Sequence, residues 1–76
     1  MNQELIEYIS SQVDRDQVNL AIKHMENDRA PLYHVDPSLH DEIVDLLEEY
    51  GEDNDLPEGW WLTDDIDPED LIFKLG

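Results

Sequence analysis

Six carboxylates precede two adjacent tryptophans in the segment EEYGEDNDLPEGWW, residues 48–61, which contains no Lys or Arg. Residues of these types can do three kinds of chemistry. Clustered carboxylates bind metal cations or basic groups, paired carboxylates transfer protons, and an exposed Trp anchors a protein partner. Each kind of chemistry needs a particular spacing, and the sequence can be searched for it.

The acidic loop EDNDLPEGWWLTDD, residues 52–65, invites comparison with the calcium-binding loop of an EF-hand. That loop needs oxygen ligands at positions 1, 3 and 5 and a glycine at position 6. A start at Asp53 puts Pro57 at position 5, and a start at Asn54 puts Leu56 at position 3. Neither register fits, so we expect no specific metal site. Weak binding of divalent cations by the clustered carboxylates stays open as an alternative function.

The three histidines do not have the spacing of metal ligands either. His34 and His40 are separated by Pro37 and a helix start, and His24 lies on an earlier helix. Exposed carboxylates outside a cleft are poorly placed for acid–base catalysis, and a chain of this length rarely encloses a pocket of several hundred Å3. We therefore predict a protein that is not an enzyme and that needs no cofactor.

Twenty-one acidic residues against four basic ones give a net charge of −17, most of it in the C-terminal half. Fifteen acids and no base lie between Arg29 and Lys74. A surface of one sign repels nucleic acids and anionic membranes and attracts basic partners. We therefore expect neither direct nucleic-acid binding nor membrane association. A DNA-binding helix-turn-helix in residues 3–27 is also excluded, because its second helix would carry only Lys23 as a base.

The composition is that of one small folded domain, residues 1–76, because 39% apolar content suffices for a core despite the charge. The absence of cysteine indicates a reducing compartment. The N-terminal residues lack the basic start and apolar run of a signal peptide, and no apolar stretch approaches the ~20 residues of a membrane span. We expect a soluble, cytoplasmic protein, and its acidic surface favours a monomer.

Apolar residues at helical spacing predict two helices within residues 1–29, joined as a helical hairpin. Leu5 and Ile9 fall on one face of the first helix, which starts near residue 3. The polar cluster SSQVDRD holds the break between the helices, and Ser11 and Asp14 have the spacing of a capping box.

A central helix is predicted over residues 36–51. Asp36 and Pro37 supply an N-cap and a proline at the first helical position, and Gly51 stands where a C-terminal cap belongs. Apolar residues at helical spacing form its inward stripe: Leu39, Ile43, Leu46, Leu47 and Tyr50.

An acidic, Trp-containing loop, residues 52–66, follows the central helix and contains a tight turn at 57–59, PEG. A C-terminal helix is predicted over 67–75, with Asp67 as its cap and Pro68 at its first position. The predicted fold class is therefore mainly α, a small bundle of about four short helices.

One alternative fold stays open. The segments LYHV and WWLT, residues 32–35 and 60–63, could pair as two strands and make the domain α+β. In an extended segment Trp60 and Trp61 would point to opposite faces, so only one of them could enter the core.

The predicted function is binding of a basic protein surface by a carboxylate-rich helix face. Acids near the C-terminus of a helix oppose its dipole, so stability does not explain the pattern. The predicted interaction residues are the charged row Asp41, Asp45, Glu48, Glu49 and Glu52, the apolar anchor Trp61, and the acidic rim of that anchor, Asp53, Asp55 and Glu58.

Two further explanations of the charge compete with this one. Acids four residues apart on a helix are about 6 Å apart along its axis, comparable with the spacing of phosphates on a nucleic-acid strand. The helix could therefore act as a nucleic-acid mimic that inhibits a DNA- or RNA-binding protein. The charge could instead serve solubility alone, without a specific partner.

Overall fold

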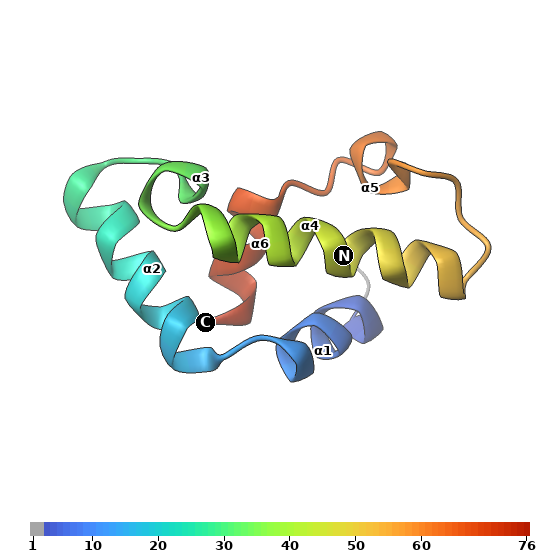
Figure 1. The fold of residues 1–76 in the computed structure, drawn as a ribbon, viewed down its shortest axis with the longest axis horizontal. Coiled ribbons are helices and arrows are strands. Elements are labelled where there is room, and N and C mark those ends of the chain that lie inside the picture. The colour runs from blue at the N-terminus through green and yellow to red at the C-terminus, as the bar shows by residue number, and fades with distance from the viewer. Residues whose placement is uncertain (1–2) are drawn as a thin grey trace.

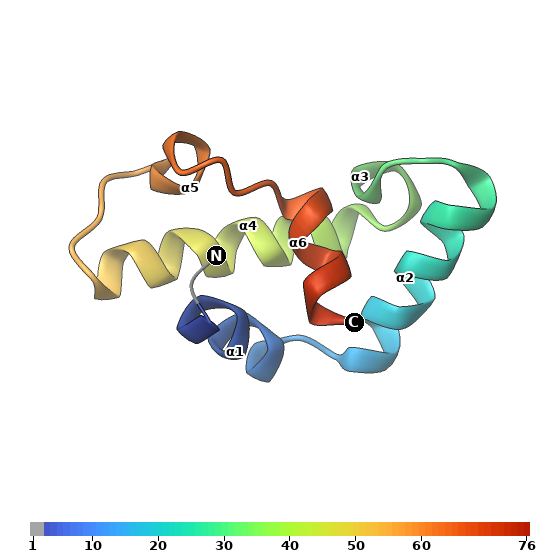
Figure 2. The same ribbon diagram turned by 180° about the vertical axis from the view of Figure 1, so that it is seen from behind.

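The computed structural model describes residues 3–76, which form six helices and no strand. In chain order they are α1 (Gln3–Gln12), α2 (Arg15–Asp28), α3 (Leu32–Val35), α4 (Pro37–Asp53), α5 (Trp60–Thr63) and α6 (Pro68–Leu75). α4 is the long central rod, and α1 and α5 lie on opposite sides of its C-terminal half (Figures 1 and 2). The mainly α prediction is confirmed.

The alternative with paired strands is wrong, because both segments form a single helical turn. Residues 32–35 follow Pro31 and close as α3 through bonds from the amides of Val35 and Asp36 to the carbonyls of Pro31 and Leu32. Residues 60–63 close as α5 after a tight turn. One-turn helices leave no periodicity long enough to distinguish them from strands.

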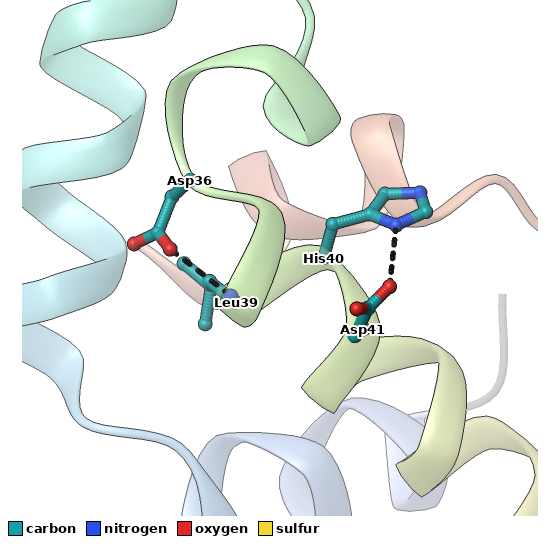
Figure 3. Close-up of polar contacts among 4 residues, drawn as sticks. All are labelled: Asp36, Leu39, His40 and Asp41. Atoms are coloured by element: carbon teal, nitrogen blue, oxygen red, sulfur yellow. Dashed lines mark hydrogen bonds and ion pairs between the residues drawn. The ribbon is translucent and has the colours of Figure 1, made fainter.

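Asp36 starts α4 as predicted. One carboxylate oxygen accepts from the backbone N–H of Leu39 at 3.1 Å (Figure 3). The other oxygen accepts from the side-chain amide of Gln17 on α2, also at 3.1 Å. Asp36 therefore caps α4 and ties its N-terminus to α2 at the same time.

Gly51 does not cap α4, so that prediction is wrong. The helix continues to Asp53, and Gly51 is buried inside it with the indole ring of Trp60 packed directly on its backbone. The C-cap is Asn54, and Asp55, the residue after it, has a left-handed φ of 56°. The amide of Leu56 then bonds back to the Gly51 carbonyl at 2.7 Å, which is the pattern of a Schellman cap.

The break between α1 and α2 also differs from the prediction. Asp14 is the N-cap of α2 and accepts from the amide of Asp16, whereas the Ser11 hydroxyl donates to the Tyr8 carbonyl within α1. No capping box forms. Asp14 caps α2 alone, and α1 and α2 diverge from the bend between them (Figures 1 and 2).

Each of these two helices packs on α6, and α1 also packs on α4, so the predicted hairpin is better described as two helices joined by a bend. Residues 1 and 2 of the predicted hairpin lie outside the described residues.

The two other turn signals are confirmed. The amide of Trp60 bonds to the carbonyl of Pro57 at 3.1 Å, and Gly59 between them has a left-handed φ of 74°. Asp67 caps α6 by accepting from the amide of Glu69, with Pro68 at the first helical position.

The core is entirely apolar: none of residues 3–76 that is buried is charged or polar. Four of the five residues of the predicted inward stripe of α4 are buried in it, and Tyr50 is half-buried against it. All the carboxylates of the described chain therefore stay at or near the surface. The buried core residues are Leu5, Ile9, Val18, Ala21, Met25, Leu32, Leu39, Ile43, Leu46, Leu47, Trp60, Leu71, Ile72 and Leu75.

We expect Gly51→Ala to destabilise the protein, although alanine is the better helix former. A Cβ at this position would lie 2.6 Å from Cδ1 and Nε1 of the Trp60 ring, which is buried and cannot retreat freely. Overpacking of this kind costs about 1–3 kcal/mol, measurable as a lower urea midpoint. The neighbouring exposed substitution Glu52→Ala is the control and should change stability by less than about 0.5 kcal/mol. A more stable Gly51→Ala variant would contradict the packing.

Candidate interaction surface

The predicted charged row on α4 divides into separate environments. Asp41, Asp45 and Glu52 are exposed, and the side chain of Asp41 is 82% accessible. At 100° per residue these three positions fall within a narrow arc opposite the buried stripe. We call Asp41, Asp45 and Glu52 the acidic ridge. Its carboxylates are held in place by a helix whose other side is the core.

Glu48 belongs to the same row by spacing, but it is half-buried and its carboxylate makes internal hydrogen bonds. Its carboxylate accepts from the indole N–H of Trp61 at 2.9 Å and from the backbone N–H of Gly59 at 3.2 Å. It therefore holds the start of α5 against α4. Because its carboxylate is occupied by these internal bonds, Glu48 has a structural role in this fold.

The two tryptophans make parallel bonds to consecutive residues of α4. The Trp60 indole donates to the Leu47 carbonyl at 2.9 Å, while the Trp61 indole donates to Glu48. This is feasible because α5 is helical, so adjacent side chains differ by about 100° instead of 180°. Trp60 is buried in the core, and Trp61 is half-buried against it.

Glu49 and Asp53 lie on the side of α4 that faces α1. Burial, then the charges of Glu49 and Asp53 and a side-chain hydrogen bond to Glu49, raise the pKa of the Tyr8 hydroxyl above 10.0. The Tyr8 ring also packs on Tyr50, with 5.8 Å between centroids, and Tyr50 packs on Trp60 at 5.7 Å. An aromatic row thus links α1 to α5 across α4.

The three acids predicted to rim Trp61 do not line the hollow beside it. Asp53 faces Tyr8, Asp55 is the left-handed residue that follows the C-cap of α4, and Glu58 shares a shallow hollow with Val44, Glu48, Glu52 and Leu56. The acids that do line the hollow beside Trp61 are Asp65, Asp67 and Asp70. Sequence reasoning missed these three, although their clustering in DDIDPED directly after the tryptophans was a usable signal.

The histidines form no metal centre with the acids. His40 lies at the edge of the acidic ridge, with its Nδ1 3.7 Å from a carboxylate oxygen of Asp41 (Figure 3), and its ring meets that of Tyr33 edge-on. Within residues 3–76 no group of three or more His, Asp or Glu side chains is arranged to hold a metal ion.

Comparisons with protein-family models, with curated proteins and with solved structures found no match to this chain. None of the helices described between residues 3 and 76 is both long and apolar enough to cross a membrane.

We expect Glu48→Ala to cost about 1–2 kcal/mol of stability, because it removes the acceptor of two N–H groups. Glu52→Ala, four residues further along α4, removes the same charge from an exposed side chain that makes no hydrogen bond within residues 3–76, and the variant should stay within about 0.5 kcal/mol of the wild type. Urea denaturation gives the free energies, and the indole N–H resonance of Trp61 should shift only in the Glu48 variant. Equal effects of the two substitutions would mean that Glu48 is an ordinary surface acid.

The raised pKa of Tyr8 gives a second test of this geometry. The folded protein holds the Tyr8 proton to a higher pH than the unfolded chain, so stability should fall as the pH rises above about 10. Tyrosinate absorbance of the wild type minus that of Tyr8→Phe isolates the titration of this residue. Glu49→Gln should lower the pKa only in part, because desolvation, the largest cause, remains. An unchanged pKa would place Glu49 away from Tyr8.

Proposed function

We propose that this protein is a non-enzymatic binding module that docks on a basic surface of another protein through the acidic ridge. The observation that supports the proposal is the fixed, exposed placement of Asp41, Asp45 and Glu52 on one side of a 17-residue helix. Because the opposite side of α4 is buried, the helix cannot rotate to hide these charges.

The stability of α4 does not explain its acids. The helix contains no Lys or Arg, so no i, i+4 pair of opposite charge forms along it. Glu49, Glu52 and Asp53 stand in its C-terminal part, where the helix dipole disfavours negative charge by roughly 0.3–1 kcal/mol each. Helix stability therefore does not account for these acids, and attraction of a basic partner is a use that their chemistry fits.

Association is the step that such a ridge improves most. Exposed charges of one sign steer an oppositely charged partner and raise the rate of encounter, and salt screens the effect. We propose that this encounter takes place in the cytoplasm, the location that a chain without cysteine favours.

Nucleic-acid mimicry is a second candidate, and the spacing of the ridge supports it. Asp41 and Asp45, four residues apart, are separated by about 6 Å along the helix axis. Asp45 and Glu52, seven residues apart, are separated by about 10 Å. Along one strand of a duplex, at about 3.4 Å per phosphate, these spacings correspond to roughly two and three phosphate steps. A mimic would occupy the site at which a DNA- or RNA-binding protein holds its phosphates.

The acidic ridge can be tested by neutralising it. We expect the triple variant Asp41→Asn, Asp45→Asn, Glu52→Gln to bind a basic partner about tenfold more weakly, since three rim charges contribute about 0.5 kcal/mol each. Partners are captured on the tagged full chain from a lysate, eluted in steps of rising salt, and then measured individually. Displacement by duplex DNA would select mimicry.

A matched triple variant, Glu7→Gln, Glu26→Gln, Asp28→Asn, removes three exposed charges from α1 and α2 instead. It leaves the net charge equal to that of the ridge variant, so it should bind nearly as the wild type does. If both triples lose the same affinity, net charge alone governs binding, and the acidic ridge is not a docking surface.

A further inference from the structure

We propose that the hollow between α5 and α6 binds a basic peptide segment through one large apolar side chain. We call it the α5–α6 groove. Its apolar lining is Trp61, Leu62, Ile66 and Pro68, and its acidic lining is Asp65, Asp67 and Asp70. The inference rests on the proposed function, because it gives the basic partner a second, apolar point of attachment.

The apolar part of the groove includes a strongly exposed residue. Leu62 is 66% exposed, more than any other large hydrophobic residue described in the chain. Beside it lie the half-buried Trp61 and Ile66. Exposed leucines occur singly on most proteins, but this one lines a shallow hollow of about 520 Å3 whose surface is partly apolar and partly acidic.

This lining is held in place by the fold. The Trp61 ring is fixed by its bond to Glu48, and the backbone N–H of Leu62 donates to the Gly59 carbonyl at 3.0 Å. The amide of Ile66 donates to the carbonyl of Trp61 at 2.8 Å, which closes the turn that contains Asp65. A preformed surface loses little conformational entropy on binding.

Charge selects the occupant. Among residues 3–76 no basic side chain lines the α5–α6 groove, and Asp65, Asp67 and Asp70 are all exposed around it. Asp67 caps α6 through Oδ1, so its second carboxylate oxygen can accept a hydrogen bond from a basic group. A Leu or Phe side chain would pack on the apolar lining of the groove, and flanking Lys or Arg residues would pair with its acidic lining. A second copy of this chain, with its net charge of −17, would meet repulsion.

Three synthetic peptides of equal length test the groove on the full chain: alternating Lys–Leu, Lys–Ser and Glu–Leu. Binding is followed by the backbone amides and the two indole N–H signals in 15N-labelled protein. We expect Lys–Leu to bind most tightly and to shift Trp61, Leu62 and Ile66. Lys–Ser should shift only exposed acidic positions, and Glu–Leu should not bind.

Leu62→Ser should weaken Lys–Leu binding by roughly fivefold to tenfold and leave Lys–Ser unchanged. Leu20→Ser is the matched control, because Leu20 is 55% exposed on α2, and it should have no effect. Asp70→Asn provides a second variant that keeps the apolar walls. It should weaken the binding of both the Lys–Leu and the Lys–Ser peptide, because it removes one acidic charge from the groove.

The outcomes separate this inference from the proposed function. If Lys–Leu shifts α4 but not Trp61, and only the ridge triple variant weakens it, the proposed function stands and the α5–α6 groove is refuted. Binding of Glu–Leu would refute the charge argument. A dimer of the wild type that Leu62→Ser dissociates in sedimentation would make a second copy the occupant and overturn the choice of a basic peptide.

Discussion

The packing of Trp60 on Gly51 is the contact on which the rest of the structure depends. Gly51 has no side chain, so the indole reaches the backbone of α4 and its N–H bonds to the Leu47 carbonyl at 2.9 Å. A helical carbonyl has a second lone pair, so this bond need not cost one inside α4. A glycine within a helix is unfavourable by about 1 kcal/mol relative to alanine, and burial of the large Trp60 ring offsets that cost.

That contact also decides which acids remain for a partner. Once Trp60 is seated, Trp61 lies beside Glu48, and the carboxylate becomes the acceptor that its indole and Gly59 need. On the other side of α4 the Tyr8–Tyr50–Trp60 row brings α1 close to Glu49. Two of the five acids of the row are thereby used internally. The acidic ridge is what remains exposed after the aromatic residues have been packed.

The sequence predicts most of this fold because its signals are local. Asp36–Pro37 and Asp67–Pro68 start their helices as expected, and the apolar stripe of α4 predicts the buried face. Gly51 misleads, because a glycine that admits an aromatic ring has the same sequence signal as one that ends a helix. The Trp60 contact responsible is tertiary. For the same reason the role of Glu48 and the acids beside Trp61 could not be assigned from spacing along the chain.

The two acidic surfaces differ in what they can discriminate. The acidic ridge presents charge on a rigid rod without an exposed large apolar residue on its arc, and charge alone attracts any basic partner and is screened by salt. The α5–α6 groove adds Trp61 and Leu62, whose contribution to the proposed binding would depend on shape and would survive salt. A ligand of the groove would need a large apolar side chain beside its basic residues, whereas a ligand of the ridge would need only basic charge. Under the two proposals, selectivity among basic partners would therefore depend on the groove, and the rate of encounter would depend on the ridge.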